Sequence, residues 1–361
     1  MESTHLTETG TRKRRRTTTP GTSGRQPSSR SGSESVTLED VARLAGVSTI
    51  TVSRALNYPD KVAAKTLEKV NRAIGQTGYV PNLLAGGLAS RRTRLIAAII
   101  PSIANLVYAE TIQYFSERLK DAGYQVLLGE SGYPEQSEQK LISAILSRRP
   151  DGILLTGVNH SADCRRLLLA ANVPLVETWD LTPSPLDVVV GFSHERIGAA
   201  IADFIAAKGY RRVGSVSASD RRAKIREKAV IDRLAEHGIT DVVGSEVPVP
   251  TDLRRGRTGL VQLLAAGFDR GVVFCSSDTL AQGVLVEAQA RGIRVPQDLA
   301  IIGFGDQSFA ADTHPALSTV RIDRPRMGRV AAEALLARID DEPLADPVID
   351  VGFEFIERGT T

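Results

Sequence analysis

The stretch from Ser48 to Asn57 carries side chains suited to reading the edges of DNA bases. Folded as a helix, it exposes Thr49, Ile50 and Arg54 on one face. An exposed arginine can bond O6 and N7 of guanine together, which discriminates that base by about 1–3 kcal/mol. Ile50 has no hydrogen-bonding group, so it can touch only apolar surface such as a thymine methyl group. The short hydroxyl side chains, better suited to helix caps and phosphate contacts, are those of Ser48, Thr51 and Ser53.

Two short helical patterns position these side chains. The first begins after Thr37, which has the spacing of a capping box with Asp40, and it ends at Gly46. Ser48 then caps the second helix. Two helices joined by a turn of about three residues form a helix-turn-helix, whose second helix lies in the major groove of DNA. A structural helical hairpin has the same spacing and remains an alternative.

A third helix is expected from Ala64 to Gln76, closed by Gly78. The residue before it, Ala63, has no side chain that could cap it, and a missing cap costs about 1 kcal/mol. The three helices together predict a DNA-binding headpiece of residues 36–80.

The first 35 residues differ in composition from the rest of the chain. They hold seven basic and three acidic residues, a net charge of +4, whereas the whole chain carries +3. Five consecutive basic residues run from Arg12 to Arg16 among many Ser, Thr, Gly and Pro residues. Such a segment is expected to be disordered. Beside a DNA-binding unit, its basic residues could add contacts with DNA phosphates. The alternatives are that it is a solubilising extension or that the start codon was assigned too early.

From Leu95 onward, short apolar runs alternate with helical patterns of about 10–15 residues, which indicates parallel sheets covered on both faces. This part spans about 265 residues, more than one core holds, and therefore predicts two doubly wound α/β subdomains. The predicted strands are 95–100, 125–129, 152–156, 175–178, 188–192, 213–216, 272–275 and 300–303, with helices such as 110–122 and 138–147.

Loops beyond the carboxyl ends of these strands are expected to bind a small ligand. A tryptophan that stacks and several hydroxyl groups suit a polyol or a sugar acid. Each candidate also has a structural explanation, since Trp179 and Tyr108 could be core aromatics and Asp278 a helix N-cap. The candidates are Ser102, Tyr108, Trp179, Ser277, Asp278 and Asp306, with Asp180 and Ser276 in the same loops.

Composition argues against several other classes of protein. No apolar run approaches the ~20 residues that span a bilayer, and no signal-peptide core follows Met1. The only cysteines are Cys164 and Cys275, which implies no disulfide framework and fits a reducing cytoplasm. Export would be needed for a solute-binding protein, but a DNA-binding pattern stands where a signal peptide should be.

No catalytic residue, metal site or cofactor is expected. The phosphate-binding patterns GxGxxG and GxxxxGK[ST] and the nucleophile pattern GxSxG do not occur. The five histidines lack the spacing of metal ligands, and His194, in the segment FSHE, is interpreted as structural. A DNA-binding regulator is therefore favoured over an enzyme and over a solute-binding protein.

Residues 38–88 contain a longer joint pattern. LEDVARLAGVS-x-x-TVSRALN is followed by GYVPN-x-x-A-x-x-L, and this combination resembles the lactose- and galactose-repressor family of bacterial regulators. The resemblance extends over residues 36–361. It implies that Thr49 and Ile50 are variable base-reading positions and that Arg54 reaches guanine. The DNA-binding residues it implies are Thr37, Ser48, Thr49, Ile50, Thr51, Ser53, Arg54, Asn57, Tyr79, Asn82, Ala85 and Leu88.

The same resemblance implies a hinge helix or linker over residues 81–92. Hinge helices of a dimer would enter the minor groove, where Leu88 would wedge into the central base step and kink the DNA. Gly86 and Gly87 depart from the usual helical composition and cost about 2 kcal/mol of helix propensity. We therefore expect this segment to become helical only on DNA.

Residues 93–361 resemble the periplasmic sugar-binding-protein core of this family, which binds the effector and forms the dimer. Arg226 matches the position whose arginine usually grips the effector, although Ala229 replaces the glycine that normally follows. The family topology implies crossings near 190–192, near 319–322 and after Ile339. It gives an N-subdomain of residues 93–191 and 322–340 and a C-subdomain of residues 192–321 and 341–361.

Several segments of the core resemble the gluconate-utilisation repressors within the family: PSIANLVYAE, GYPEQSEQ, VPLVETWDLTPSPLDVVVGF and IGFGD. The resemblance implies a cytoplasmic homodimer on a pseudo-palindromic operator and a repressor released by gluconate or a phosphorylated or oxidised relative. A different sugar or sugar phosphate is the alternative effector. The sequence does not show whether the effector acts as an inducer or as a co-repressor. No leucine heptad array precedes the C-terminus, which favours a dimer over a tetramer.

Overall fold

The computed structural model describes residues 36–80, 92–132 and 135–361. These residues form two compact units, which divide between residues 82 and 83, and each unit is described by itself. The expected basic tail and residues 81–91 of the expected hinge lie outside the described residues. None of the described helices is long and apolar enough to cross a membrane.

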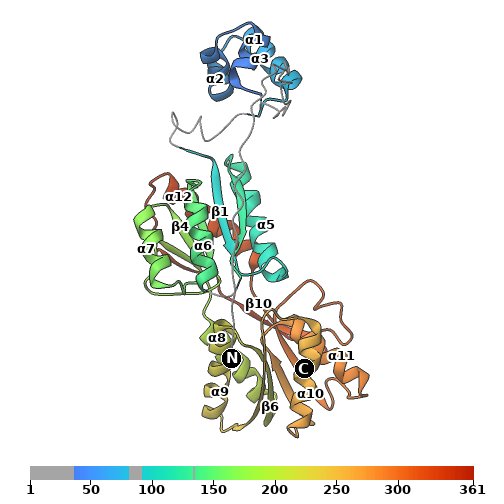
Figure 1. The fold of residues 1–361 in the computed structure, drawn as a ribbon. Coiled ribbons are helices and arrows are strands. Elements are labelled where there is room, and N and C mark those ends of the chain that lie inside the picture. Colours follow the sequence, from blue (N-terminus) through green and yellow to red (C-terminus); the bar gives the residue numbers. More distant parts are fainter. Residues whose placement is uncertain (1–35, 81–91, 133–134) are drawn as a thin grey trace, which may run out of the picture. The chain divides into compact units, whose positions relative to one another are not determined.

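The first unit is built from three short helices around one small core (Figure 1). They are α1 (Leu38–Ala45), α2 (Thr49–Asn57) and α3 (Ala64–Thr77), with a 3₁₀ turn at Pro59–Lys61 before α3. Their apolar faces meet at residues spaced three or four apart, as amphipathic helices require. The buried residues of this core are Val41, Ala42, Ala45, Val52, Ala55, Val70 and Ala73.

The ends of these helices are those that the sequence predicted. The Thr37 hydroxyl accepts from the backbone N–H of Asp40, and the Asp40 carboxylate accepts from the Thr37 N–H, which completes the capping box. Gly46 and Gly78 end α1 and α3 with φ of 67° and 66°, a conformation that glycine adopts without strain. Ala63 provides no side-chain cap for α3.

The second unit contains two doubly wound α/β subdomains, each with a six-stranded sheet. The first sheet has the order β11-β5-β4-β3-β1-β2, and all its strands are parallel. Its strands are β1 (Leu95–Ile100), β2 (Gln125–Glu130), β3 (Gly152–Thr156), β4 (Leu175–Thr178), β5 (Val188–Gly191) and β11 (Val348–Asp350).

The second sheet has the order β12-β10-β9-β8-β6-β7 and is parallel except for β12, which runs antiparallel to β10. Apart from Arg212, Gly271 and Arg321, the residues of its four central strands are buried, as expected for a sheet covered on both faces. Its strands are β6 (Arg212–Ala218), β7 (Asp241–Val247), β8 (Gly271–Cys275), β9 (Leu299–Gly305), β10 (Ser318–Arg321) and β12 (Glu354–Ile356).

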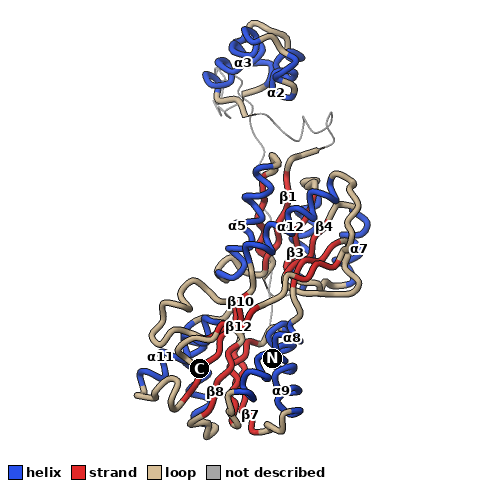
Figure 2. The backbone as a smooth tube through the Cα atoms, turned by 180° about the vertical axis from the view of Figure 1, so that it is seen from behind, coloured by secondary structure: helices blue, strands red, loops and turns tan. Residues whose placement is uncertain are grey.

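Helices cover both faces of each sheet (Figures 1 and 2). On the first sheet, α5 (Leu106–Asp121) and α12 (Arg324–Ile339) pack on one face, and α6 (Glu135–Leu146) and α7 (Ala162–Ala171) on the other. On the second sheet, one face is covered by α8 (His194–Ala207) and α9 (Arg221–Glu236), and the other by α10 (Leu253–Ala265) and α11 (Asp278–Ala290).

The last crossing between the subdomains differs from the expected one after Ile339. β11 pairs with β5 in the first sheet, and the backbone bonds Val189 N–Pro347 O (2.8 Å) and Val351 N–Gly191 O (2.8 Å) extend this pairing. Residues 341–351 therefore stay with the N-subdomain, and the chain crosses between β11 and β12. A three-residue edge strand has too few residues to show a period, which is why the sequence pattern did not reveal it.

Candidate functional site

One face of α2 is free to contact a partner. Ile50 is 70% exposed and Arg54 is exposed, whereas Val52 and Ala55 on the opposite face are buried in the core of the first unit. Thr49 is half-buried at the start of the helix. A short helix that presents an arginine and an isoleucine outward fits the major groove of DNA, where such helices read bases.

The hydroxyl residues around α2 hold its ends. Ser48 accepts from the backbone N–H of Thr51 (3.2 Å), and the two hydroxyls lie 2.9 Å apart. Asn57 donates to the carbonyl of Ser53 (2.9 Å). Tyr79 packs partly buried against the core of this unit. Three candidates, Asn82, Ala85 and Leu88, lie outside the described residues.

Two adjoining cavities open between the two subdomains, at the carboxyl ends of the strands. The larger has a volume of about 180 Å³ and the smaller about 70 Å³, and both are lined by Tyr108, Asp220 and Arg222. The larger is also lined by Pro101, Ser131, Gly132, Glu138, Thr156, Gly157, Asn159, Asp180 and Arg221. The smaller is also lined by Asn105, Val107, Trp179, His194, Ala218, Arg226, Val249, Thr251, Ser276, Ser277 and Phe304.

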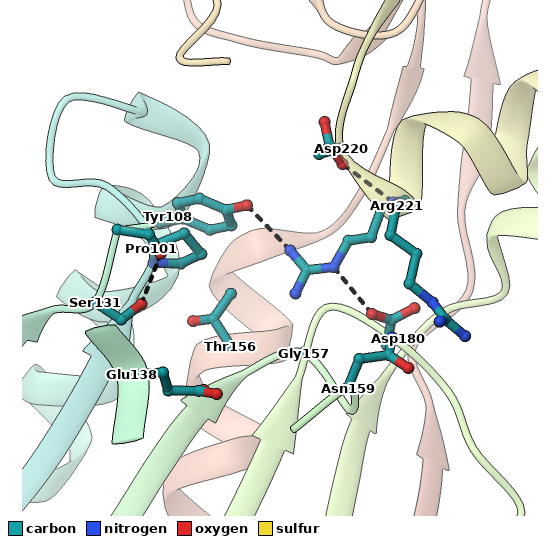
Figure 3. Close-up of a pocket in the computed structure, with 12 residues that line it drawn as sticks. Pro101, Tyr108, Ser131, Glu138, Thr156, Gly157, Asn159, Asp180, Asp220 and Arg221 are labelled. Atoms are coloured by element: carbon teal, nitrogen blue, oxygen red, sulfur yellow. Dashed lines mark hydrogen bonds and ion pairs between the residues drawn. The ribbon is translucent and has the colours of Figure 1, made fainter. Parts of the chain in front are cut away.

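Arg222 joins the two subdomains across these cavities. From the first turn of α9 it donates to the Asp180 carboxylate (Nε–Oδ2, 2.9 Å) and to the Tyr108 hydroxyl (3.0 Å), contacts that Figure 3 shows as dashed lines. Burial raises the pKa of Asp180, and Arg222 acts in the opposite direction. Asp220 caps α9 by accepting from the N–H groups of Arg222 and Ala223.

Arg226 lies one helical turn further along α9 and is buried, with 4% of its surface exposed. It donates to Nδ1 of His194 (2.9 Å) and to the carbonyl of Ser276 (2.9 Å), and its guanidinium lies 3.8 Å from the ring centroid of Phe304. Its Nε is buried without a hydrogen-bond partner. Burial lowers the pKa of Arg226 to about 10, although Asp220 opposes the shift.

The charge of Arg226 is unbalanced at close range. Among the described residues, no carboxylate lies within 4.0 Å of its nitrogens. His194 cannot supply a charge, because an arginine can only donate, so Nδ1 of His194 accepts and its Nε2–H donates to the carbonyl of Trp179 (3.0 Å). Burial also lowers the pKa of His194 well below its usual value. A buried cation without a paired anion is costly, so this site favours an anionic ligand.

Trp179 forms part of the wall of the smaller cavity. It is 3% exposed and packs edge-on against Tyr108 (5.2 Å between ring centroids) and Phe192 (5.8 Å). Its backbone has φ of 70°, which is strained for a bulky residue. The turn is possible because Gly191 lies below it: a Cβ there would be 1.9 Å from the Asp180 carbonyl oxygen.

The structure brings four of the seven ligand candidates together, namely Tyr108, Trp179, Arg226 and Ser277, and places the other three elsewhere. Asp278 is buried; Thr319 and the Gln307 N–H donate to its carboxylate, and burial raises its pKa to about 6. It is not the cap of α11, a role that Ser277 fills.

Asp306 and Ser102 also do not line the two cavities. Asp306 forms ion pairs with Arg321 (2.6 Å) and Arg358 (2.8 Å) and lines a separate cavity near the crossing segments. Ser102 is buried, and its carbonyl accepts from the N–H of Asn105. The sequence correctly predicted that both residues follow the carboxyl end of a strand. Whether a loop side chain points into a cavity depends on tertiary packing, which the sequence pattern does not show.

Sequence reasoning missed Arg222, Glu138 and Phe304 and assigned His194 a purely structural role. Only Arg222 left a usable signal, because a spacing of four residues puts it on the same helical face as Arg226. Glu138 and Phe304 come from elements whose orientation depends on tertiary packing. Among the described residues there is no group of three or more His, Cys, Asp or Glu side chains arranged to hold a metal ion.

Comparisons with known proteins cover both units. Residues 37–82 match the family described as bacterial regulatory proteins, lacI family, and residues 202–361 match the periplasmic binding protein-like domain. The chain is 39% identical over 328 residues to the HTH-type transcriptional regulator GntR of Pseudomonas aeruginosa, covering 90% of this chain and 95% of that protein.

Solved structures show the same relationship. A LacI-family transcriptional regulator from Silicibacter pomeroyi matches with a TM-score of 0.84 and 33% identity, over 90% of this chain and 99% of that chain. The transcription regulator GntR from Chromobacterium violaceum matches with a TM-score of 0.71 and 37% identity, over 74% and 98%. With this identity over nearly its whole length, the chain belongs to the lacI family of bacterial DNA-binding transcriptional regulators.

Proposed function

We propose that this protein is a cytoplasmic homodimeric repressor of sugar-acid utilisation genes, released from its operator by a hydroxylated carboxylate such as gluconate. The observation that carries the choice of ligand is Arg226, a buried guanidinium without a carboxylate partner at the wall of the smaller cavity. A ligand carboxylate would pair with it, and charge-assisted bonds of this kind are about twice as strong as neutral ones.

The rest of the site suits a small polyhydroxylated molecule. The cavities of about 180 and 70 Å³ are below the size range of about 300–1,000 Å³ typical of sites for drug-sized ligands. Side chains with hydroxyl or amide groups line them, and hydroxyl groups of a sugar acid would bond these. They include Asn105, Ser131, Thr156, Asn159, Thr251 and Ser277. The core segments that resemble gluconate-utilisation repressors support the same ligand.

For DNA binding, we propose that Thr49, Ile50 and Arg54 face the bases of the operator. The residues at the ends of α1 and α2, together with Tyr79, would contact phosphates, and Asn82, Ala85 and Leu88 would enter the minor groove. The ligand acts by altering the arrangement of the two subdomains in the dimer, so that the hinge segments no longer fit the operator. By linkage, operator DNA weakens ligand binding by the same factor. No catalytic step is part of this proposal.

Fluorescence of Trp179, the only tryptophan in the chain, tests the ligand directly. Titration with gluconate is expected to give a saturable change, and calorimetry is expected to give one site per chain. Arg226→Met should abolish both signals, whereas Arg233→Met, a half-buried position on the same helix outside both cavities, should leave them intact. A flat response of the wild type by both methods would exclude gluconate and direct the search to phosphogluconate and ketogluconates.

Measurements of operator affinity test the regulatory part of the proposal separately from the choice of ligand. Gluconate should weaken the binding of the wild-type protein to its operator. It should leave the operator affinity of the Arg226→Met variant unchanged. Binding of gluconate that leaves operator affinity unchanged would contradict the mechanism of release while leaving the ligand assignment intact.

A further inference from the structure

A second charged cluster borders the larger cavity. His160 lies between two glutamates, with Nδ1 2.9 Å from Oε1 of Glu138 and Nε2 3.4 Å from Oε1 of Glu177. Nε2 also lies 3.1 Å from the carbonyl oxygen of Gly157. The side chains of His160 and Glu177 are 1% and 0% exposed, whereas Glu138 is 15% exposed and lines the cavity.

Both ring nitrogens of His160 face oxygen atoms, an arrangement that a doubly protonated imidazole satisfies. Every partner of its two ring nitrogens is an oxygen acceptor, and a neutral imidazole can donate from only one nitrogen. Burial alone would lower the pKa of His160, but the neighbouring carboxylates of Glu138 and Glu177 overcome this effect and raise it to about 9. His160 is therefore a cation at neutral pH, and it compensates the charge of the glutamates.

The two cavities differ in charge. The larger is lined by three carboxylates, of Glu138, Asp180 and Asp220, and by the two guanidiniums of Arg221 and Arg222. The smaller is lined by two guanidiniums and a single carboxylate. Of these two cavities, Arg226 lines the smaller and Glu138 lines the larger. The smaller cavity therefore attracts an anionic group, and the larger cavity does not.

Glu138 differs from the other two carboxylates of the larger cavity in how it is paired. Asp180 is bonded to Arg222, which lines the cavity itself, and Asp220 accepts from two backbone N–H groups at the start of α9. The partner of Glu138 is His160, which does not line the cavity. Glu138 is therefore the carboxylate of this cavity whose ion-pair partner does not itself line the cavity, and Figure 3 shows it apart from Asp220 and Arg221.

From this arrangement we infer that Glu138 determines ligand specificity and that His160 positions it. Glu138 accepts a hydrogen bond from a hydroxyl group of a ligand whose carboxylate lies at Arg226. The ligand class is then a polyhydroxylated acid with one anionic end and one hydroxyl end, and acids with anionic groups at both ends are rejected by repulsion from Glu138. This inference rests on the proposed function, because it assumes that the carboxylate binds at Arg226.

Calorimetry on the full-length protein tests the inference with three ligands. Gluconate has one anionic end, whereas glucarate and 6-phosphogluconate are anionic at both ends. The wild type is expected to bind gluconate at least tenfold more tightly than either of the others. This ratio requires no variant, so it holds as a test even if a substitution prevents folding.

Two variants assign the selectivity to named side chains. Glu138→Gln removes the negative charge and adds an amide donor, and it should reduce the gluconate-to-glucarate ratio at least tenfold. His160→Gln removes the positive charge that compensates Glu138 and Glu177, so repulsion of a second anionic group should increase and the same ratio should rise. Glu117→Gln, an exposed position on α5, is the matched control and should leave the ratio unchanged. A purely structural role would lower both affinities together and preserve the ratio.

The outcomes separate this inference from the proposed function. Wild-type protein that binds gluconate and glucarate equally well would overturn the inference alone, as would a Glu138→Gln variant with an unchanged ratio. Wild-type protein that binds no gluconate would overturn the proposed ligand, and tight binding of glucarate or 6-phosphogluconate in its place would overturn both.

Discussion

Arg222 donates from Nε to Oδ2 of Asp180 over 2.9 Å, and this ion pair links the first turn of α9 in the C-subdomain to the loop after β4 in the N-subdomain. Both side chains are largely buried, at 16% and 9% exposed, so solvent screens the pair only weakly. Arg222 lines both cavities, and Asp180 lines the larger one.

Breaking this pair should destabilise the core. Asp180→Asn leaves Arg222 buried beside a neutral group, and loss of one partner of a buried pair typically costs about 3–5 kcal/mol. We expect a loss at or below the lower end of that range, because the Tyr108 hydroxyl still accepts from Arg222. Urea unfolding followed by Trp179 fluorescence measures it. The exposed pair of Arg212 and Asp269 is the control, and Asp269→Asn should cost less than about 1 kcal/mol. Equal losses would contradict a special role for the pair across the cavity.

Gly191→Ala should disrupt the wall of the smaller cavity. The new Cβ would lie 1.9 Å from the Asp180 carbonyl oxygen, so the strained turn at Trp179 must move. The expected result is a loss of at least about 2 kcal/mol of unfolding free energy, of the order found for overpacked cores, and a changed emission maximum of Trp179. Gly75→Ala provides the contrast, since nothing lies within 4 Å of a Cβ there and alanine favours its helix by about 0.5–1 kcal/mol. An unchanged Trp179 spectrum in Gly191→Ala would refute this account of the turn.

The cluster at His160 predicts how stability depends on pH. The pKa of His160 is raised from about 6.5 in the unfolded chain to about 9 in the fold. The raised pKa contributes roughly 3 kcal/mol to the free energy of unfolding. This contribution is fully present below pH 6.5 and is lost as the pH rises through 9. Unfolding at pH 6.5, 8 and 9.5, followed by Trp179, should show this decline in the wild type. His160→Gln should show a shallower slope, and an identical slope would mean that His160 is not charged in the fold.

Arg54 should contribute sequence discrimination rather than general affinity. Loss of a bidentate contact with guanine costs about 1–3 kcal/mol, so Arg54→Ala should bind the operator about 5- to 150-fold more weakly while its non-specific binding changes little. Arg72→Ala removes an exposed arginine that is paired with Glu68 on α3 and should leave the discrimination intact. Competition between operator and random DNA at fixed salt measures both effects. Uniform weakening on all sequences would identify Arg54 as a phosphate contact.

The sequence was most informative where local chemistry decides the structure. Thr37, Ser48 and Gly46 are helix-end residues by their own side-chain or backbone chemistry, and the structure places each at the predicted end. The buried strands were equally readable, because long apolar runs bounded by helical patterns suit a covered parallel sheet. All eight predicted strands are present.

The rest depends on tertiary contacts. β7 lies at the edge of its sheet with alternating exposure, and β11 and β12 have three residues each. In the binding site, Asp278 and Asp306 follow strands as predicted, but their partners, such as Thr319 and Arg358, come from distant parts of the chain. Glu138 becomes notable only because packing brings it to His160, twenty-two residues away.

The pairing of β11 with β5 has a consequence for biosynthesis. The N-subdomain begins with β1 but is completed by α12 and β11, which the ribosome makes after β6 to β10 of the other subdomain. The N-subdomain therefore cannot finish folding first, in contrast to the usual order of domains during translation. A nascent chain that stops at residue 340 would leave an open sheet edge at β5, and each subdomain would gain its last strand only after α12 has been made, β11 in the N-subdomain and β12 in the C-subdomain.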